Sequence, residues 1–246
     1  MNTNTQEISP QRYARIAGAF YLIIIVAGFL AEVFIRGKLI VSGDATATAN
    51  NILASETLWR LGVAGDLLMH LSDIPVMLCL FVLIRPVNRR LALLSVLFNL
   101  IQTAVLVANK LFLILPLFLL GGAAYLSVFT TGQLNTLAYV SIKLHGYGFG
   151  LGLIFFGGTC LVEGYLIRRS GFLPRALGYG MQLAGVCYLV NSFALILSPG
   201  LQSKLFPAIL LPAFLAELSL CLWLLIRGVD VPKWREAVAG NRKPAL

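Results

Sequence analysis

Six long apolar segments constrain the fold of this chain more than any other feature of its sequence. In a helix, about 20 mostly apolar residues cross a hydrocarbon core of roughly 30 Å. Only helices and closed barrels satisfy every backbone polar group in lipid, and the alternating pattern of a barrel strand is absent here. The sequence therefore predicts an all-α polytopic membrane helix bundle, a single domain over residues 1–246, with spans at residues 14–35, 58–84, 91–112, 137–167, 176–197 and 205–226.

The composition lies outside the range of soluble globular proteins. Hydrophobic residues make up 59% of the chain and charged residues 12%, and the mean hydropathy is +0.87. A soluble domain carries about 25% charged residues. The lipid bilayer is therefore the expected surrounding of this protein.

The net charge of +9 predicts topology and not nucleic-acid binding, because the positive residues gather in alternate connections between the spans. The positive-inside rule then places both termini in the cytoplasm, as in a multi-pass protein of the bacterial inner (plasma) membrane. Thirteen residues carry this signal: Arg12, Arg15, Arg85, Arg89, Arg90, Arg168, Arg169, Arg175, Arg227, Lys233, Arg235, Arg242 and Lys243.

The longest polar connection, residues 37–57, predicts a short helix on the outer face. Gly43, Asp44 and Thr46 form a turn and N-cap signal, and residues 47–55 follow as an amphipathic stretch. We expect this helix to lie on the membrane surface.

Residues 111–129 are apolar enough for a seventh crossing, but a seventh crossing would move the basic connection after residue 167 to the outer face. Pro116, Gly121 and Gly122 also disfavour a continuous helix there. We therefore predict that the third span ends near residue 112 and that an interfacial or re-entrant segment follows it.

Small residues predict close helix packing in the fourth span. Gly146 and Gly150 form a small-xxx-small pair within a glycine-rich stretch.

The cysteines lie one to a span without a CxxC pair, which predicts apolar core residues and neither a disulfide nor a metal framework. They are Cys79, Cys160, Cys187 and Cys221.

Ionisable residues within the spans are the best indication of function. Asp66, His70 and Asp73 stand at i, i+4 and i+7 on the second span and so form a narrow stripe, with Pro75 just beyond them. Because hydrocarbon cannot hydrate ionised groups, such residues are costly and by default mark a functional site. The stripe is therefore expected to face protein or water.

Other spans place polar residues at comparable depth, which predicts one pocket lined by five helices. Glu32 and Lys110 are expected nearer the outer surface, and Glu163 near the cytoplasmic end. The predicted lining of the pocket is Asp66, His70, Asp73, His145 and Glu217, with Asn99, Gln102 and Asn191 as further candidates.

Two interpretations of these polar residues remain open. Hydrogen bonds between helices, each worth about 0.6 to 2 kcal/mol, account comfortably for Asn99, Gln102 and Asn191. A carboxylate at the bilayer centre costs roughly 2.5 to 3.5 kcal/mol, so packing alone accounts less well for the acids. Carboxylates and imidazoles in one pocket would couple in titration. The leading hypothesis is therefore binding or movement of a proton, a cation or a small polar solute, with the acids as charge acceptors and His70 as the group that titrates near neutral pH.

An enzyme and a structural subunit are the alternatives. A metal-dependent hydrolase or transferase acting on a lipid-like substrate would use His70, His145, Asp66 and Asp73 as ligands, but no HExxH or comparable pair supports it. No nucleophile motif and no cofactor is indicated. In a structural or partner-binding subunit, the polar groups would only lock the helices together.

Several stretches together resemble an uncharacterised bacterial membrane family, domain of unknown function 4386 (DUF4386), over nearly the whole chain. The resemblance implies an integral membrane protein of about six helices. It implies no activity and supplies no catalytic residues. The stretches that carry it are Gly43–Ala49, Ser55–Arg60, Leu83–Asn88, His145–Phe149, Ser170–Arg175 and Glu217–Trp223.

Overall fold

The computed structural model describes residues 9–241 and contains only helices and connections over that range. Arg242 and Lys243, which contribute to the predicted positive-inside signal, lie outside the described residues. The α-helices are α1 (Pro10–Phe29), α2 (Gly37–Leu39), α3 (Ala45–Ala54), α4 (Glu56–Ile84), α5 (Arg89–Asn109), α6 (Leu111–Leu120), α7 (Thr131–Ser170), α8 (Arg175–Leu197), α9 (Pro199–Leu205), α10 (Leu211–Ile226) and α11 (Val231–Asn241). A π-helical segment, η1 (Leu30–Arg36), continues α1, and η2 (Ala124–Leu126) and η3 (Ala208–Leu210) are 3₁₀ turns.

Six helices of the described chain are long and apolar enough to cross a membrane, as the sequence predicts. The first combines α1, η1 and α2, and the third combines α5 and α6. The spans run over Pro10–Leu39, Glu56–Ile84, Arg89–Leu120, Thr131–Ser170, Arg175–Leu197 and Ala208–Ile226.

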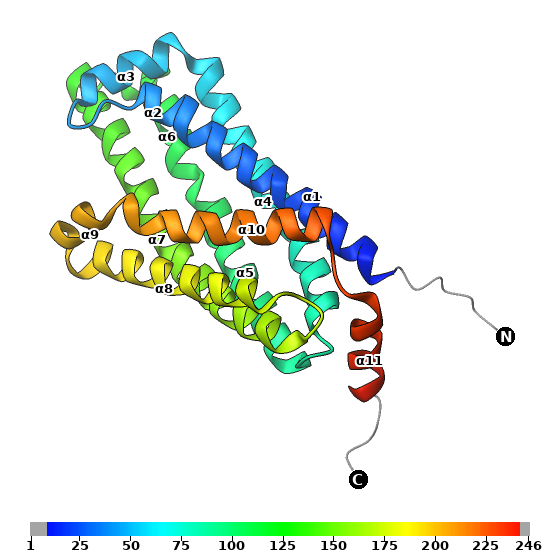
Figure 1. Ribbon diagram of the computed structural model, residues 1–246. Helices are drawn as coiled ribbons and strands as arrows, with labels where there is room; N and C mark the ends of the chain where they lie inside the picture. Colours follow the sequence, from blue (N-terminus) through cyan, green and yellow to red (C-terminus); the bar gives the residue numbers. More distant parts are fainter. Residues whose placement is uncertain (1–8, 242–246) are drawn as a thin grey trace.

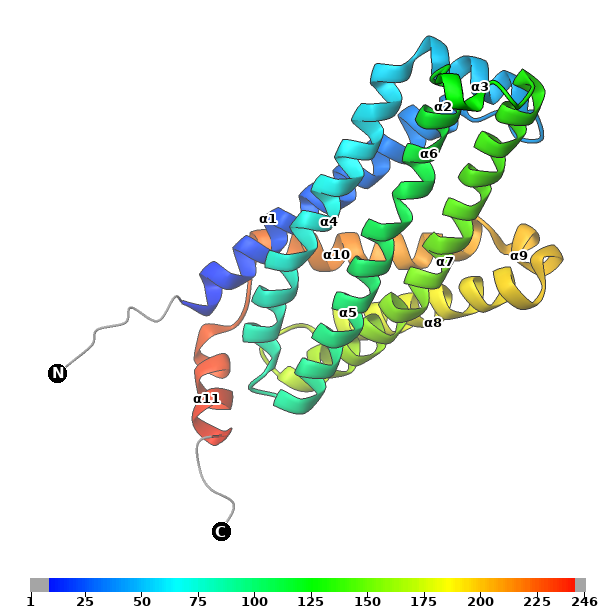
Figure 2. The ribbon, with the colours of Figure 1, turned by 180° about the vertical axis from the view of Figure 1, so that it is seen from behind.

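The connections gather at the two ends of the bundle. In both views, α3 and the end of α6 lie at one end, which is at the upper left in Figure 1, and α9 lies below them on the same side of the picture (Figures 1 and 2). The start of α1, the α4–α5 and α7–α8 connections and α11 lie at the opposite end. We call these the α3 end and the α11 end. The helices α8 and α10 cross the direction of α4 and α5 obliquely.

The third span is longer than the sequence predicts, because its helix continues beyond Pro116 to Leu120. A proline inside a helix leaves the carbonyl four residues earlier without its usual donor. Here that carbonyl belongs to Phe112, and the Ser141 hydroxyl of α7 donates to it at 2.6 Å. The neighbouring helix therefore supplies the hydrogen-bond donor that the proline lacks. The span ends at Leu120 and is followed by Gly121 as its C-cap. Gly122 then adopts the left-handed conformation, with a φ of 72°.

The connection before α4 contains a helix close to the one predicted. Asp44 caps α3 by accepting a hydrogen bond from the Ala47 amide at 2.8 Å. Ile52 of α3 packs with Trp59 of α4 and Leu113 of α6 in a small apolar cluster. The helix therefore covers the α3 end of the bundle.

The largest apolar core lies towards the α11 end, where α1, α4, α7, α8 and α10 meet. Trp234 of α11 donates to the Leu83 carbonyl at 2.9 Å, which fixes this last helix to the end of α4. At its start, Asp230 accepts hydrogen bonds from Lys233, and these lower the pKa of the Asp230 carboxyl.

Many large apolar side chains elsewhere are exposed along the helices, as expected where they face lipid.

Of the predicted Gly146–Gly150 pair, only Gly150 packs closely against a neighbouring helix, because a Cβ added there would lie 2.6 Å from the Leu195 side chain of α8. A Cβ added at Gly146 would meet no atom within 4 Å. The tight contacts with a neighbouring backbone lie further along α7, where a Cβ at Gly164 would come within 2.6 Å of the Gly178 carbonyl of α8. The sequence shows the glycines but not which of them face a neighbouring backbone.

We predict that Gly164→Ala destabilises the protein by about 1 to 3 kcal/mol, because the added methyl group forces the α7 and α8 backbones apart. Gly146→Ala is the matched control, and we expect it to be neutral or stabilising by up to about 1 kcal/mol because alanine favours a helix. Unfolding of the purified variants in detergent measures both effects. Equal effects of the two substitutions would contradict this account of the packing.

Candidate functional site

Buried polar side chains lie in three hydrogen-bonded clusters inside the bundle. We name them the outer, middle and inner clusters in order from the α3 end to the α11 end. The stripe on α4 establishes this order, because Asp66 belongs to the outer cluster and Asp73 to the middle one, and α4 begins at the α3 end. The inner cluster surrounds Glu217 of α10.

The outer cluster is a buried ionic network. Arg36 donates to both oxygens of Asp66, at 2.8 and 3.3 Å, and to Glu32 at 2.6 Å. Lys110 lies 3.1 Å from Asp66 and 3.3 Å from Nε2 of His145. Because an ammonium group only donates, His145 accepts through Nε2 and is neutral, with its proton on Nδ1.

Local backbone irregularities place the two cations of this cluster. Arg36 ends the π-helical turn η1, a wide turn of a kind often found at functional sites. Lys110 stands at the junction of α5 and α6, where its amide bonds to the Val107 carbonyl three residues earlier instead of four. The neighbouring Asn109 donates to the His145 carbonyl at 2.9 Å and so joins this junction to α7.

The middle cluster pairs a histidine with an acid. Nδ1 of His70 lies 3.2 Å from Asp73, which also accepts a hydrogen bond from Thr103 of α5 at 3.1 Å. His70 is buried, and its Nε2 has no hydrogen-bond partner. The buried Oδ1 of Asn99 on α5 also has none. Gln102 lies beside Thr103, with 3.5 Å between the hydroxyl and the amide oxygen.

The inner cluster holds Glu217 between two tyrosines. Tyr21 of α1 donates to one carboxylate oxygen at 2.9 Å, and Tyr188 of α8 donates to the other. Glu163 of α7 is also buried, and within residues 9–241 its side chain makes no hydrogen bond or ion pair. This cluster therefore joins α1, α8 and α10 around an acid.

The residues predicted to line one pocket are thus distributed over successive levels of the bundle. Asp66 and His145 lie on either side of Lys110 in the outer cluster, His70 and Asp73 pair in the middle cluster, and Glu217 lies in the inner one. Asn191 lies apart from all three and accepts from Gln202 of α9 at 3.4 Å.

Several partners were not among the predicted site residues, among them Arg36, Lys110, Tyr21 and Tyr188. Arg36 and Lys110 have sequence positions near span ends, where long basic side chains ordinarily extend to the interface. Tyr21 and Tyr188 lie in apolar segments and resemble core aromatics in the sequence. The only signal in the sequence for these four residues is that a polar group recurs at each depth of the bundle where a buried acid lies.

The clusters differ in how their charges are balanced. Asp66 is paired with two cations. In contrast, no lysine or arginine of the described chain forms an ion pair with Asp73, Glu163 or Glu217. The described residues also contain no group of three or more histidine, cysteine, aspartate or glutamate side chains suited to a metal ion.

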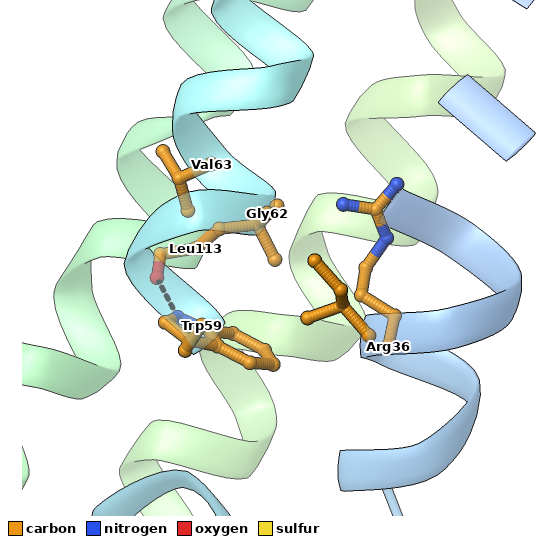
Figure 3. A pocket seen from close by; sticks show the side chains of 6 residues that line it. Arg36, Trp59, Gly62, Val63 and Leu113 are labelled. Carbon is orange, nitrogen blue, oxygen red and sulfur yellow. Dashed lines mark hydrogen bonds between the residues drawn. The ribbon is translucent and has the colours of Figure 1, made fainter. Parts of the chain in front are cut away.

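A small pocket lies beside the outer cluster (Figure 3). Its walls come from Ile35, Trp59, Gly62, Val63 and Leu113 and from the aliphatic stem of Arg36, and it is too narrow to hold a water molecule. The Trp59 indole donates to the Leu113 carbonyl at 2.7 Å. These contacts hold the Arg36 stem, while its guanidinium group points away from the tryptophan (Figure 3).

The chain is similar to a family of known proteins over most of its length. The model of the family described as "Domain of unknown function (DUF4386)" matches residues 16–228. The chain belongs to this family. An "Uncharacterized protein" of Archaeoglobus fulgidus is 24% identical over 169 residues, which cover 68% of this chain and 83% of that protein. No solved structure matches the chain.

We predict that Asp66→Asn destabilises this DUF4386 protein by about 3 to 5 kcal/mol, because it leaves two buried cations without their shared carboxylate. Combining Arg36→Met, Asp66→Leu and Lys110→Met removes all three charges and is expected to restore most of the lost stability. Unfolding in detergent measures both changes, with the exposed Asp230→Asn as a control. A triple variant no more stable than Asp66→Asn would contradict this account.

Proposed function

We propose that this membrane protein binds protons at the middle and inner clusters and exchanges them across the bilayer. One observation carries the proposal. Asp73, Glu163 and Glu217 lie within the bundle, and no basic side chain pairs with them in the described residues. In a low-dielectric interior a charged group must be paired or neutralised. A bound proton or cation therefore has to balance these acids.

The geometry favours a proton over a metal cation. Both oxygens of Glu217 already accept a tyrosine hydroxyl, so a metal ion would have to displace Tyr21 or Tyr188. A proton needs no cavity and can be shared within the existing hydrogen bonds. The imidazole of His70 offers its unpartnered Nε2 for proton uptake, while Asp73 at Nδ1 would stabilise the resulting imidazolium.

The middle and inner clusters follow one another along the bundle. Asp73 stands on α4 after His70, towards the α11 end, and Glu163 lies near the end of α7, also towards the α11 end. In this proposal, protons pass along a series from His70 and Asp73 through Glu217 to Glu163.

The positive residues support a bacterial inner-membrane protein with the α11 end in the cytoplasm. The α4–α5 and α7–α8 connections and α11, which carry basic residues in the sequence, lie at that end. Because cytoplasmic connections carry an excess of lysine and arginine, both ends of the chain belong on that side in this proposal.

We expect wild-type protein in liposomes to dissipate an imposed pH gradient, and Asp73→Asn and Glu217→Gln each to lower the rate at least tenfold. Each substitution removes a group that accepts a proton while keeping its size. A trapped pH-sensitive dye reports the flux, with valinomycin present to balance charge. Glu56→Gln, an exposed substitution on α4, is the matched control and should retain the wild-type rate.

Two results would contradict the proton proposal. One is a wild-type rate no higher than that of empty liposomes. The other is retention of the rate by correctly inserted Asp73→Asn and Glu217→Gln variants. If apolar replacements at these positions also stabilise the bundle, the result favours the structural alternative, in which the polar groups only join helices.

The topology predicts opposite labelling of two introduced cysteines. All four native cysteines are buried. Thr46→Cys on α3 should react with a membrane-impermeant thiol reagent in intact spheroplasts, and Arg235→Cys on α11 only after permeabilisation. The reverse pattern would overturn the proposed orientation.

A further inference from the structure

The buried part of the outer cluster carries more positive than negative charge. The side chains of Arg36 and Lys110 are only 11% and 3% exposed, and they share the carboxylate of Asp66, which is 1% exposed. The second acid of the network, Glu32, is 68% exposed. His145 is neutral in its observed contact with Lys110. Two buried cations therefore face one buried anion.

Glu32 balances the excess positive charge of the outer cluster, but its carboxylate lies at the surface of the bundle and not in the interior. Its neighbours Phe29, Val33 and Phe34 are large exposed apolar residues, so this face of the first span borders lipid. The residue also lies towards the α3 end of that span. An exposed ion pair contributes little stability, so a competing anion can displace Glu32 at small cost.

The cations retain unused donors. A guanidinium group has five N–H donors, and Arg36 uses three of them, one on Glu32 and two on Asp66. Lys110 has three donors and uses two. The Glu32 carboxylate, at 2.6 Å from Nε of Arg36, shows that an oxyanion has room at this position.

We propose that the outer cluster is a binding site for a phosphate group, which displaces the Glu32 carboxylate from Arg36. Arg36 holds the phosphate through its Nε and free Nη donors, in the planar geometry that suits oxyanions. Lys110 contacts the same Asp66 carboxylate as Arg36 and so supplies a second positive charge near the phosphate. The walls around the Arg36 stem keep the guanidinium oriented before the ligand arrives (Figure 3).

The phosphate group can belong to an anionic lipid or be free inorganic phosphate. Both offer the same oxygens to Arg36. The lipid-facing position of Glu32 allows a headgroup to reach the guanidinium from the side. The site is separate from the acids of the proton proposal, so each proposal can fail alone.

A second ion pair of the chain provides an internal control. Glu56 and Arg60 of α4 have the same i, i+4 spacing and the same 2.6 Å contact as Glu32 and Arg36. Their side chains are 50% and 61% exposed, and Arg60 has no second buried cation beside it. Removal of Glu56 therefore reproduces the loss of a surface acid without creating the proposed site.

The test measures the unfolding midpoint of the purified full-length protein in neutral detergent against inorganic phosphate, at ionic strength held constant with chloride. A ligand that binds the folded state raises this midpoint as its concentration rises. We expect Glu32→Gln to tighten the apparent Kd about tenfold, because phosphate no longer competes with a charge-assisted hydrogen bond. Glu56→Gln should match wild type, and Arg36→Gln and Lys110→Met should weaken binding about tenfold or more.

A lipid arm distinguishes the two sources of phosphate. Native mass spectrometry counts the phosphatidylglycerol molecules retained by wild type, Glu32→Gln and Glu56→Gln after extraction from mixed phosphatidylglycerol and phosphatidylcholine vesicles. Extra phosphatidylglycerol on Glu32→Gln alone identifies the lipid headgroup, and a phosphate effect without lipid retention identifies the free ion. Equal behaviour of Glu32→Gln and Glu56→Gln in both arms overturns the proposal. This comparison stays decisive even if Lys110→Met fails to fold, because both glutamates are exposed.

Discussion

Hydrocarbon cannot hydrate a charged group, and the pairing of side chains inside this bundle follows from that constraint. At the outer level, Arg36 and Lys110 converge on Asp66 and join the first, second and third spans. Removal of Asp66 would leave both buried cations without their shared counter-ion. The same constraint places imidazole and hydroxyl groups beside Asp73 and two phenol groups beside Glu217.

The three clusters neutralise their buried acids in different ways, and this difference bears on the proposed functions. The outer cluster uses fixed cations, which neutralise its acid permanently. In the middle and inner clusters no cation of the described residues pairs with Asp73 or Glu217, and the imidazole of His70 and the hydroxyls of Tyr21 and Tyr188 hydrogen-bond to these acids instead. A network of fixed charges stabilises a conformation and attracts anions, whereas a network of exchangeable protons responds to pH. The proposed phosphate site and the proposed proton sites therefore follow from one physical distinction.

The helix count and the stripe on α4 could be read from the sequence, because both depend on the local period of the chain. The end of the third span could not. Pro116 predicts a break, but Ser141 of another helix occupies the freed carbonyl, and a contact across 29 positions leaves no local signal. Likewise Gly146 and Gly164 look equivalent in the sequence, and only the place of α8 separates them.

By itself, the sequence determined that the chain has six segments long and apolar enough to cross a membrane and that costly groups lie within them, because length, hydropathy and helical period are local properties. Only the tertiary structure decided which groups meet. The sequence placed five residues in one pocket, whereas the fold distributes them over three levels and gives Asp66 two cations that seemed to belong to the surface. The reason is geometric: the tilt and rotation of each helix set its partners, and these depend on packing against the whole bundle.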